Sequence, residues 1–191
     1  SAIDYLGFPL SVSETFQQRN TNKSIAQALE AVSAIQELCV ARNRTLVVYL
    51  SMGFGNPYGE AWSPPLLVEF TQKMQALGVR IVSLADTIGA AGPDDIYLAF
   101  QMLTQQFPEI EFGAHFHSTP GAWAEKVDAA WNAGCRRFDG ALRGFGGCPF
   151  AKEELVGNIA TENLIHYVRG RGKILPINDA ALTEALMISD N

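Results

Sequence analysis

Apolar runs rich in β-branched residues alternate along the chain with segments whose apolar positions recur every three or four residues. The first pattern predicts buried strands and the second predicts amphipathic helices. Because the two patterns alternate, we expect parallel strands joined by right-handed helical crossovers. The predicted strands are residues 2–8, 45–51, 80–84, 111–115 and 136–139, and the predicted helices are residues 24–42, 64–77, 94–107 and 122–133.

Residue types that begin or end helices support several of these boundaries. Ser24 is the expected N-cap of the first helix, because its hydroxyl can accept a hydrogen bond from a free N–H of the first turn. Pro64 and Pro65 suit the first turn of the next helix, and Gly78 suits its end. Thr161 is the expected N-cap of a final helix.

Side chains suited to chemistry follow the ends of predicted strands: Asp86, then His115 with His117, then Cys148. No phosphate-binding glycine fingerprint follows the first strand, which argues against a nucleotide-binding sheet. A (β/α) barrel assembles its active site from the loops after its strands, so this placement favours a barrel. A complete barrel usually needs about 250 residues, more than the chain contains. We expect one α/β domain over residues 1–191, and the sequence pattern alone leaves both an open doubly wound sheet and a barrel possible.

The charge and composition of the chain indicate which kind of molecule it binds. The net charge is −6 and no run of five or more Lys or Arg occurs, so the basic footprint of a nucleic-acid binder is missing from the sequence. No apolar run approaches the roughly 18 residues that a membrane span needs. The odd number of cysteines, three, argues against a disulfide framework and for a reducing compartment. We expect a cytoplasmic or mitochondrial-matrix protein that acts on a small molecule.

The motif HFH provides candidate metal ligands. His115 and His117 lie two residues apart on an extended segment, so both imidazoles point to the same side of a strand. Neutral imidazole is the commonest metal ligand in proteins. The alternative is a pair of hydrogen-bonded histidines at a strand end, and the motif alone leaves both interpretations open.

Cys148 lies in a glycine-rich segment, RGFGGCPFA, and Pro149 stiffens its exit. Gly144, Gly146 and Gly147 can adopt positive φ, so this thiol can lie on a loop that swings toward a substrate and donates a proton. A glycine-rich turn with an incidental cysteine is the alternative.

Three oxygen-bearing side chains complete the set of candidates. Asn158 offers a neutral oxygen ligand, and Glu162 follows it at the start of the predicted final helix. Asp86 closes a strand with a carboxylate that can orient a ligand or carry a proton. For each of the three, the alternative is a capping or turn residue.

Four segments occur in the order and at the spacing found in 3-hydroxy-3-methylglutaryl-CoA lyases: LADTIGAAGP, HFH, FDGALRGFGGCPFA and GNIATENL. The most specific part is GGCP, followed ten residues after the cysteine by the asparagine of GN. The chain thus resembles the C-terminal portion of this family. The resemblance implies a partial TIM (β/α)8 barrel with strands four to eight and a short C-terminal helical extension.

The resemblance also implies roles for individual residues. His115, His117 and Asn158 match three ligands of a divalent cation, with Mg2+ or Mn2+ expected. Cys148 matches the catalytic thiol of the family. The resemblance further implies catalytic roles for His115, Asp86 and Glu162. An acyl-CoA thioester is the implied substrate, and a homodimer is the expected assembly.

Two departures from the family pattern limit these implications. The family's remaining ligand, an aspartate beside a catalytic arginine after the first strand, has no counterpart in the sequence. Because the chain begins at the equivalent of strand four, with Ser1 rather than Met, we infer a fragment and expect it to be inactive in isolation. Ser118 stands where the family usually has Asp, which leaves the choice of substrate open.

The implied reaction cleaves 3-hydroxy-3-methylglutaryl-CoA to acetyl-CoA and acetoacetate. His115 or Asp86 would take the hydroxyl proton, and Cys148 would protonate the enolate. One alternative is another metal-dependent aldolase or acyl-CoA synthase of the same barrel superfamily. The other is a non-catalytic fragment that completes its sheet through another chain, because an incomplete barrel leaves two unpaired edges.

Overall fold

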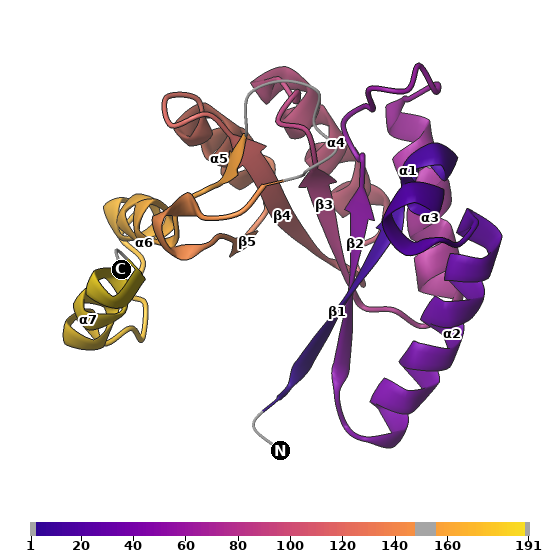
Figure 1. Ribbon diagram of the computed structural model, residues 1–191, viewed down its shortest axis with the longest axis horizontal. Helices are drawn as coiled ribbons and strands as arrows, with labels where there is room; N and C mark the ends of the chain where they lie inside the picture. Colours follow the sequence, from indigo (N-terminus) through magenta and orange to yellow (C-terminus); the bar gives the residue numbers. More distant parts are fainter. Residues whose placement is uncertain (1–2, 148–155, 190–191) are drawn as a thin grey trace.

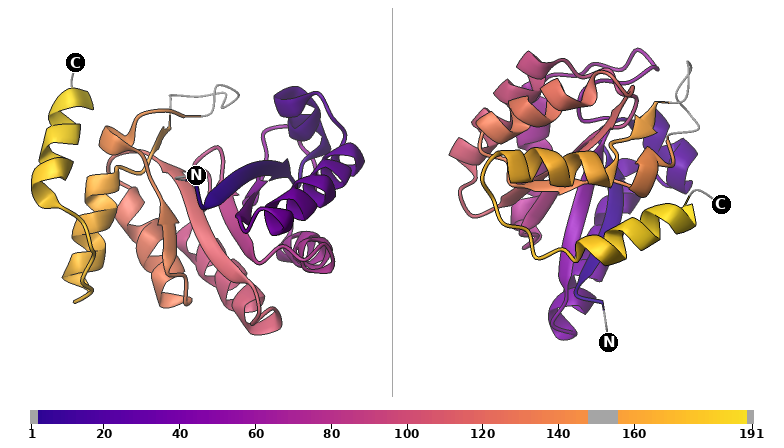
Figure 2. Two further views of the ribbon diagram at one scale, coloured as in Figure 1. Left: turned by 90° about the horizontal axis from the view of Figure 1, so that it is seen from below. Right: turned by 90° about the vertical axis from the view of Figure 1, so that its left-hand side faces the viewer.

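The computed structural model describes residues 3–147 and 156–189. Five parallel strands form a curved sheet in the order β1-β2-β3-β4-β5, and four helices that connect successive strands cover its convex face (Figures 1 and 2). The strands are β1 (Tyr5–Ser11), β2 (Thr45–Ser51), β3 (Ile81–Asp86), β4 (Glu111–Ser118) and β5 (Arg137–Asp139), and the four helices are α2 (Ile25–Ala41), α3 (Pro64–Ala76), α4 (Pro93–Gln106) and α5 (Trp123–Asn132).

Shorter elements complete the fold. Helix α1 (Glu14–Thr21) follows β1, and the turn η1 (Leu142–Gly144) follows β5. Strand β6 (Gly157–Asn158) pairs antiparallel with the end of β4. Helices α6 (Thr161–Gly170) and α7 (Asp179–Ser189) follow at the C-terminal side, where they lie beyond β5 (Figure 1).

The alternation of side chains along the strands gives the sheet two different faces. Val48, Leu84 and Phe116 are almost fully buried in the main apolar core, which also includes side chains of the covering helices. Residues at the intervening positions, such as Ser83 and His115, face the concave side. Polar side chains are therefore gathered on the concave face of the sheet.

The predicted order of strands and helices is confirmed, and most boundaries lie within one or two residues of the prediction. The first strand is an exception: it covers Tyr5–Ser11 rather than residues 2–8. Strand β4 also continues to Ser118 instead of ending at residue 115. Its extra residues pair with β6, and nothing in the local sequence pattern announces that pairing.

Helix ends follow the sequence signals at Ser24, at Pro64 and at Gly78, which has φ +77° just after the end of α3, but not at Thr161. Ser24 is the N-cap of α2 and forms a reciprocal capping box with Gln27. Pro64 begins α3, as predicted. Thr161 is not the N-cap of α6: it is the first helical residue, and Ala160 occupies the cap position without a side-chain hydrogen bond.

Among residues 3–147 and 156–189, β1 and β5 are the edges of the parallel sheet, each with one parallel neighbour. Exposed apolar side chains gather on the β1 edge, including Ile3 and Leu6, and a cavity of about 480 Å³ lies between β1 and α2. In the part of the chain that the structure describes, every helix is too short or too polar to cross a membrane.

Candidate active site

A cavity of about 490 Å³ lies on the concave face, at the carboxyl ends of the strands. All five parallel strands or the loops that follow them contribute to it, so residues far apart in the sequence share one wall. Its lining residues are Pro9, Tyr49, Ser51, Ala85, Thr87, His115, His117, Asp139 and Gly140.

The two histidines of β4 line this cavity together, as the spacing of two predicts. The ring centroids of His115 and His117 are 5.4 Å apart. Phe116 between them is buried on the opposite face, where its ring makes edge contacts with Phe54 and Phe100. The apolar core therefore fixes the segment that carries both imidazoles.

The ring of His117 is oriented by a backbone group. Its Nδ1 lies 2.9 Å from the carbonyl oxygen of Thr87, and a carbonyl can only accept, so Nδ1 carries the proton when the ring is neutral. The lone pair is then on Nε2. A histidine held in this way is typical of metal ligands, because the second hydrogen bond fixes the tautomer and raises the basicity of the ligating nitrogen.

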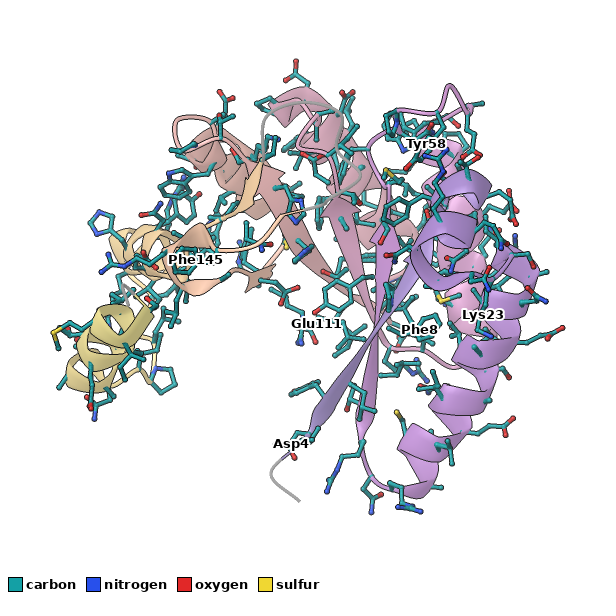
Figure 3. All side chains as sticks on the ribbon, in the orientation of Figure 1. Asp4, Phe8, Lys23, Tyr58, Glu111 and Phe145 are labelled. Atoms are coloured by element: carbon teal, nitrogen blue, oxygen red, sulfur yellow. The ribbon has the colours of Figure 1, made fainter. Side chains whose placement is uncertain are left out.

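Asn158 lies beside His117 through the pairing of β6 with β4. The two residues are register partners, so their side chains project to the same side of the pairing. The amide nitrogen of Asn158 donates to the carbonyl oxygen of Phe145 at 2.8 Å, which leaves its oxygen as the available ligand atom (Phe145 is labelled in Figure 3). The structure thus brings together the three residues that the sequence predicts as metal ligands.

His115 has an unsatisfied ring nitrogen. Its Nδ1 is buried and has no hydrogen-bond partner among the described residues. Burial lowers the pKa of His115 from its ordinary value, and the neighbouring His117 lowers it further. Burial also lowers the pKa of His117. Both imidazoles are therefore held neutral, which is the form that binds metals.

These features fit a divalent cation bound by two imidazole nitrogens and one amide oxygen. Among residues 3–147 and 156–189, no three His, Cys, Asp or Glu side chains lie close enough together to hold a metal ion. A metal site built from the described residues therefore depends on the amide oxygen of Asn158. This donor set is smaller than the four ligands that the resemblance implies.

Asp86 does not line the cavity, although its neighbours Ala85 and Thr87 do. The side chain of Asp86 is 1% exposed and points toward the helices, where it forms an ion pair with Lys126 at 2.7 Å. Its two oxygens also accept hydrogen bonds from the backbone of Ala90 and Ala91. This arrangement favours the turn-residue interpretation of Asp86.

The other two predicted catalytic residues are not brought to the cavity by the described structure. Glu162 lies in the first turn of α6 and accepts a hydrogen bond from the backbone N–H of Arg143 at 3.3 Å. Cys148 lies outside the described residues. Before it, Gly144 and Gly146 have positive φ, and a Cβ on Gly144 would lie 2.6 Å from the backbone oxygen of Asn158.

Two cavity residues were not identified from the sequence, Asp139 and Tyr49. Asp139 ends β5 as the register partner of His115, and it accepts a hydrogen bond from Ser83 at 3.3 Å. Burial raises the pKa of Tyr49 to about 12, and the adjacent Asp139 carboxylate contributes to the increase. Asp139 is thus a carboxylate inside the cavity, the position that Asp86 was expected to occupy.

A signal for these residues was present in the strand pattern. In β2, Tyr49 and Ser51 lie two positions apart. Ser83 in β3 and Thr87 just after it share the same parity, with Ala85 between them. Interpreting β2 as a strand buried on both faces hid this alternation. Polar residues at period two in a parallel sheet indicate a polar concave face, on which ligand-binding groups gather.

Comparison with known proteins gives a family match over nearly the whole chain. A family model described as HMGL-like matches residues 4–188. The hydroxymethylglutaryl-CoA lyase of Pseudomonas mevalonii is 33% identical over 162 residues, which is 85% of this chain and 54% of that protein. The (R)-citramalyl-CoA lyase of Chloroflexus aurantiacus is 31% identical over 97% of this chain and 58% of that protein.

A solved structure gives the same result for the fold. The HMG-CoA lyase from Acinetobacter baumannii, in complex with coenzyme A and 3-methylmalate, matches with a TM-score of 0.83 and 31% identity over 95% of this chain and 59% of that chain. The predicted partial barrel is confirmed by this likeness. The chain spans about half the length of the curated relatives it matches.

Proposed function

The chain belongs to the HMGL-like family, and we propose that the full-length protein is a metal-dependent carbon–carbon lyase of acyl-CoA thioesters. One observation carries this proposal: His115 and His117 line a cavity at the carboxyl end of the sheet, and Asn158 lies directly opposite His117 in the pairing of β4 with β6. Active sites of barrel enzymes form at this end.

We propose that these three residues hold a Mg2+ or Mn2+ ion. Such an ion supplies Lewis acidity and a template for substrate oxygens when it is bound. The chain's own contribution is to keep both imidazoles neutral through burial and to orient His117 through the carbonyl of Thr87. The amide oxygen of Asn158 completes the set.

The proposed reaction cleaves 3-hydroxy-3-methylglutaryl-CoA into acetoacetate and acetyl-CoA. The hydroxyl loses its proton, the bond between C2 and C3 of the acyl group breaks, and the acetyl-CoA enolate takes up a proton at carbon. His115 and Asp139 are the candidates to accept the hydroxyl proton because both line the cavity. We assign Asp86 no proton transfer, since its carboxylate faces Lys126 instead.

(R)-citramalyl-CoA is the second candidate substrate, because the citramalyl-CoA lyase relative aligns with 97% of this chain. Ser118 also differs from the residue usual in the hydroxymethylglutaryl-CoA lyases. It is buried, it donates to the carbonyl of Thr119, and it lines a pocket of about 310 Å³ together with Trp123 and Asn158. A change here alters the wall beside the proposed metal ligand.

The two substrates differ by one methylene between the hydroxyl-bearing carbon and the carboxylate. A methylene changes specificity by about 10- to 200-fold. We expect kcat/KM of the full-length protein for 3-hydroxy-3-methylglutaryl-CoA to exceed that for (R)-citramalyl-CoA by this factor, measured by release of acetyl-CoA from each. The opposite order would assign the protein to citramalyl-CoA cleavage, and no release from either would contradict the proposed lyase.

Cys148 is the proposed donor of the proton to the enolate. Replacing it by Ser in the full-length protein keeps the size of the side chain but raises its pKa far above that of a thiol. We expect kcat to fall by about 10²- to 10⁴-fold, the usual contribution of a general acid. Cys39 is buried in the helical layer, and Cys39→Ser serves as the control for losing a thiol elsewhere. Unchanged acetoacetate release by Cys148→Ser would refute this role.

A further inference from the structure

Lys126 on α5 is a buried cation with all of its hydrogen bonds made inside the protein. Its side chain is 4% exposed. Nζ donates to the Asp86 carboxylate at 2.7 Å, to the carbonyl of Gly89 at 2.8 Å and to the carbonyl of His117 at 3.2 Å. An ammonium group has three donors, so these acceptors use its full capacity.

The carboxylate of Asp86 connects the ammonium group of Lys126 to the loop between β3 and α4. Asp86 accepts from the backbone N–H groups of Ala90 and Ala91 at 2.9 and 3.1 Å. Gly89 has φ +70°, and a Cβ there would lie 3.3 Å from the carbonyl oxygen of His117. The loop over residues 87–91 is thus held closely against the end of β4.

Two contacts hold His117 in place, one from Lys126 to its backbone and one from the loop to its ring. The backbone carbonyl of His117 accepts from Lys126, and its ring Nδ1 contacts the carbonyl of Thr87. The Thr87 hydroxyl in turn accepts from the backbone N–H of Met52 at 2.7 Å, which fixes the start of the loop. A shift of residues 87–91 would therefore release the contact that sets the tautomer of His117.

We propose that Lys126 is a positioning residue for His117, acting through its buried ion pair with Asp86. The inference rests on the proposed metal site, for which His117 supplies a ligand. Lys126 does not line the cavity, and its Nζ contacts His117 through the backbone carbonyl. It fixes the backbone of His117 directly and the tautomer-setting loop through Asp86 and Gly89.

A purely stabilising role accounts less well for this arrangement. Lysines on amphipathic helices usually extend their ammonium groups into water. Burying a charge pair is costly, and well-packed apolar residues of similar volume often stabilise a fold equally well or better. Apolar side chains cannot hold the carbonyls of Gly89 and His117, and this is what the ion pair adds.

The test uses the metal-free chain first. We expect ¹⁵N chemical shifts of the wild-type protein to show His117 in a single neutral tautomer with the proton on Nδ1. Lys126→Met alone leaves Asp86 buried without a counter-charge, so the informative protein is the double variant D86N/K126M, which removes both charges. In it we expect a mixture of tautomers at His117, with folding checked by circular dichroism.

Metal binding provides the second measurement. By calorimetry with Mn2+, we expect the dissociation constant of D86N/K126M to rise about 10- to 100-fold, as for other residues that orient metal ligands. Lys73→Met is the matched control, because Lys73 forms an equally short but exposed ion pair with Glu69 on α3. That variant should match the wild type in both measurements.

The outcomes separate this inference from the proposed function. A wild-type His117 with its proton on Nε2 overturns the positioning role, whatever the variants do. A folded double variant with the wild-type tautomer and wild-type Mn2+ affinity also overturns it. If the wild type binds no Mn2+ but the tautomer of His117 shifts in the double variant, the positioning role stands and the proposed metal site fails.

Discussion

Replacing His117 by Ala is expected to abolish Mn2+ binding at the proposed site and to lower lyase turnover by about 10³-fold or more. The substitution removes both the ligating nitrogen and the ring contact with Thr87. A bound cation contributes several kcal/mol of charge stabilisation in the transition state, and each 1.4 kcal/mol corresponds to about tenfold in rate. Calorimetry with Mn2+ and an acetoacetate assay of the full-length variant measure the two effects.

The chain offers a matched control for this substitution. It contains three histidines, and the third, His166, is exposed on α6. His166→Ala should retain both Mn2+ binding and turnover. If His117→Ala kept its turnover while remaining folded, the proposed role of this residue as a metal ligand would be wrong.

Phe116→Ala is expected to lower the free energy of unfolding by about 3–5 kcal/mol, the usual cost of emptying a buried phenylalanine site. The ring is 1% exposed and has edge contacts with Phe54 and Phe100. Because Phe116 lies between the two histidines, the cavity left behind would also loosen the strand end that carries them. Urea unfolding followed by circular dichroism measures the change in stability.

An exposed apolar residue provides the comparison for this prediction. Leu98 on α4 is 55% exposed, so Leu98→Ala should change the free energy of unfolding by about 0.5 kcal/mol or less. A loss below about 1 kcal/mol for Phe116→Ala would show that the aromatic contacts around Phe116 do not anchor the end of β4.

The order of strands and helices was predictable because each element has a local signature. The burial pattern of β2 and the capping box at Ser24 are both encoded within a few consecutive residues. Helix α1 was missed because it is short and polar, and its stability depends on the Ser13 cap and on contacts with distant segments. The pairing of β6 with β4 is likewise non-local.

Part of the site was predictable, because side chains at odd and even positions along a strand point to opposite faces of the sheet. His115 and His117 share parity, and both line the cavity. Asp86 has the opposite parity to the cavity residues Ala85 and Thr87 that flank it, so its side chain points toward the helices although it also ends a strand. Lys126 carried no signal at all, because a lysine on an amphipathic helix predicts an exposed side chain.

We propose above that His115, His117 and Asn158 bind one divalent cation at the carboxyl end of the sheet. Anomalous diffraction from crystals grown with Mn2+ tests it most directly. We expect an anomalous peak at about 2.0–2.3 Å from a ring nitrogen of each histidine and from the amide oxygen of Asn158. The absence of a peak between these residues, with Mn2+ bound elsewhere or nowhere, would contradict it.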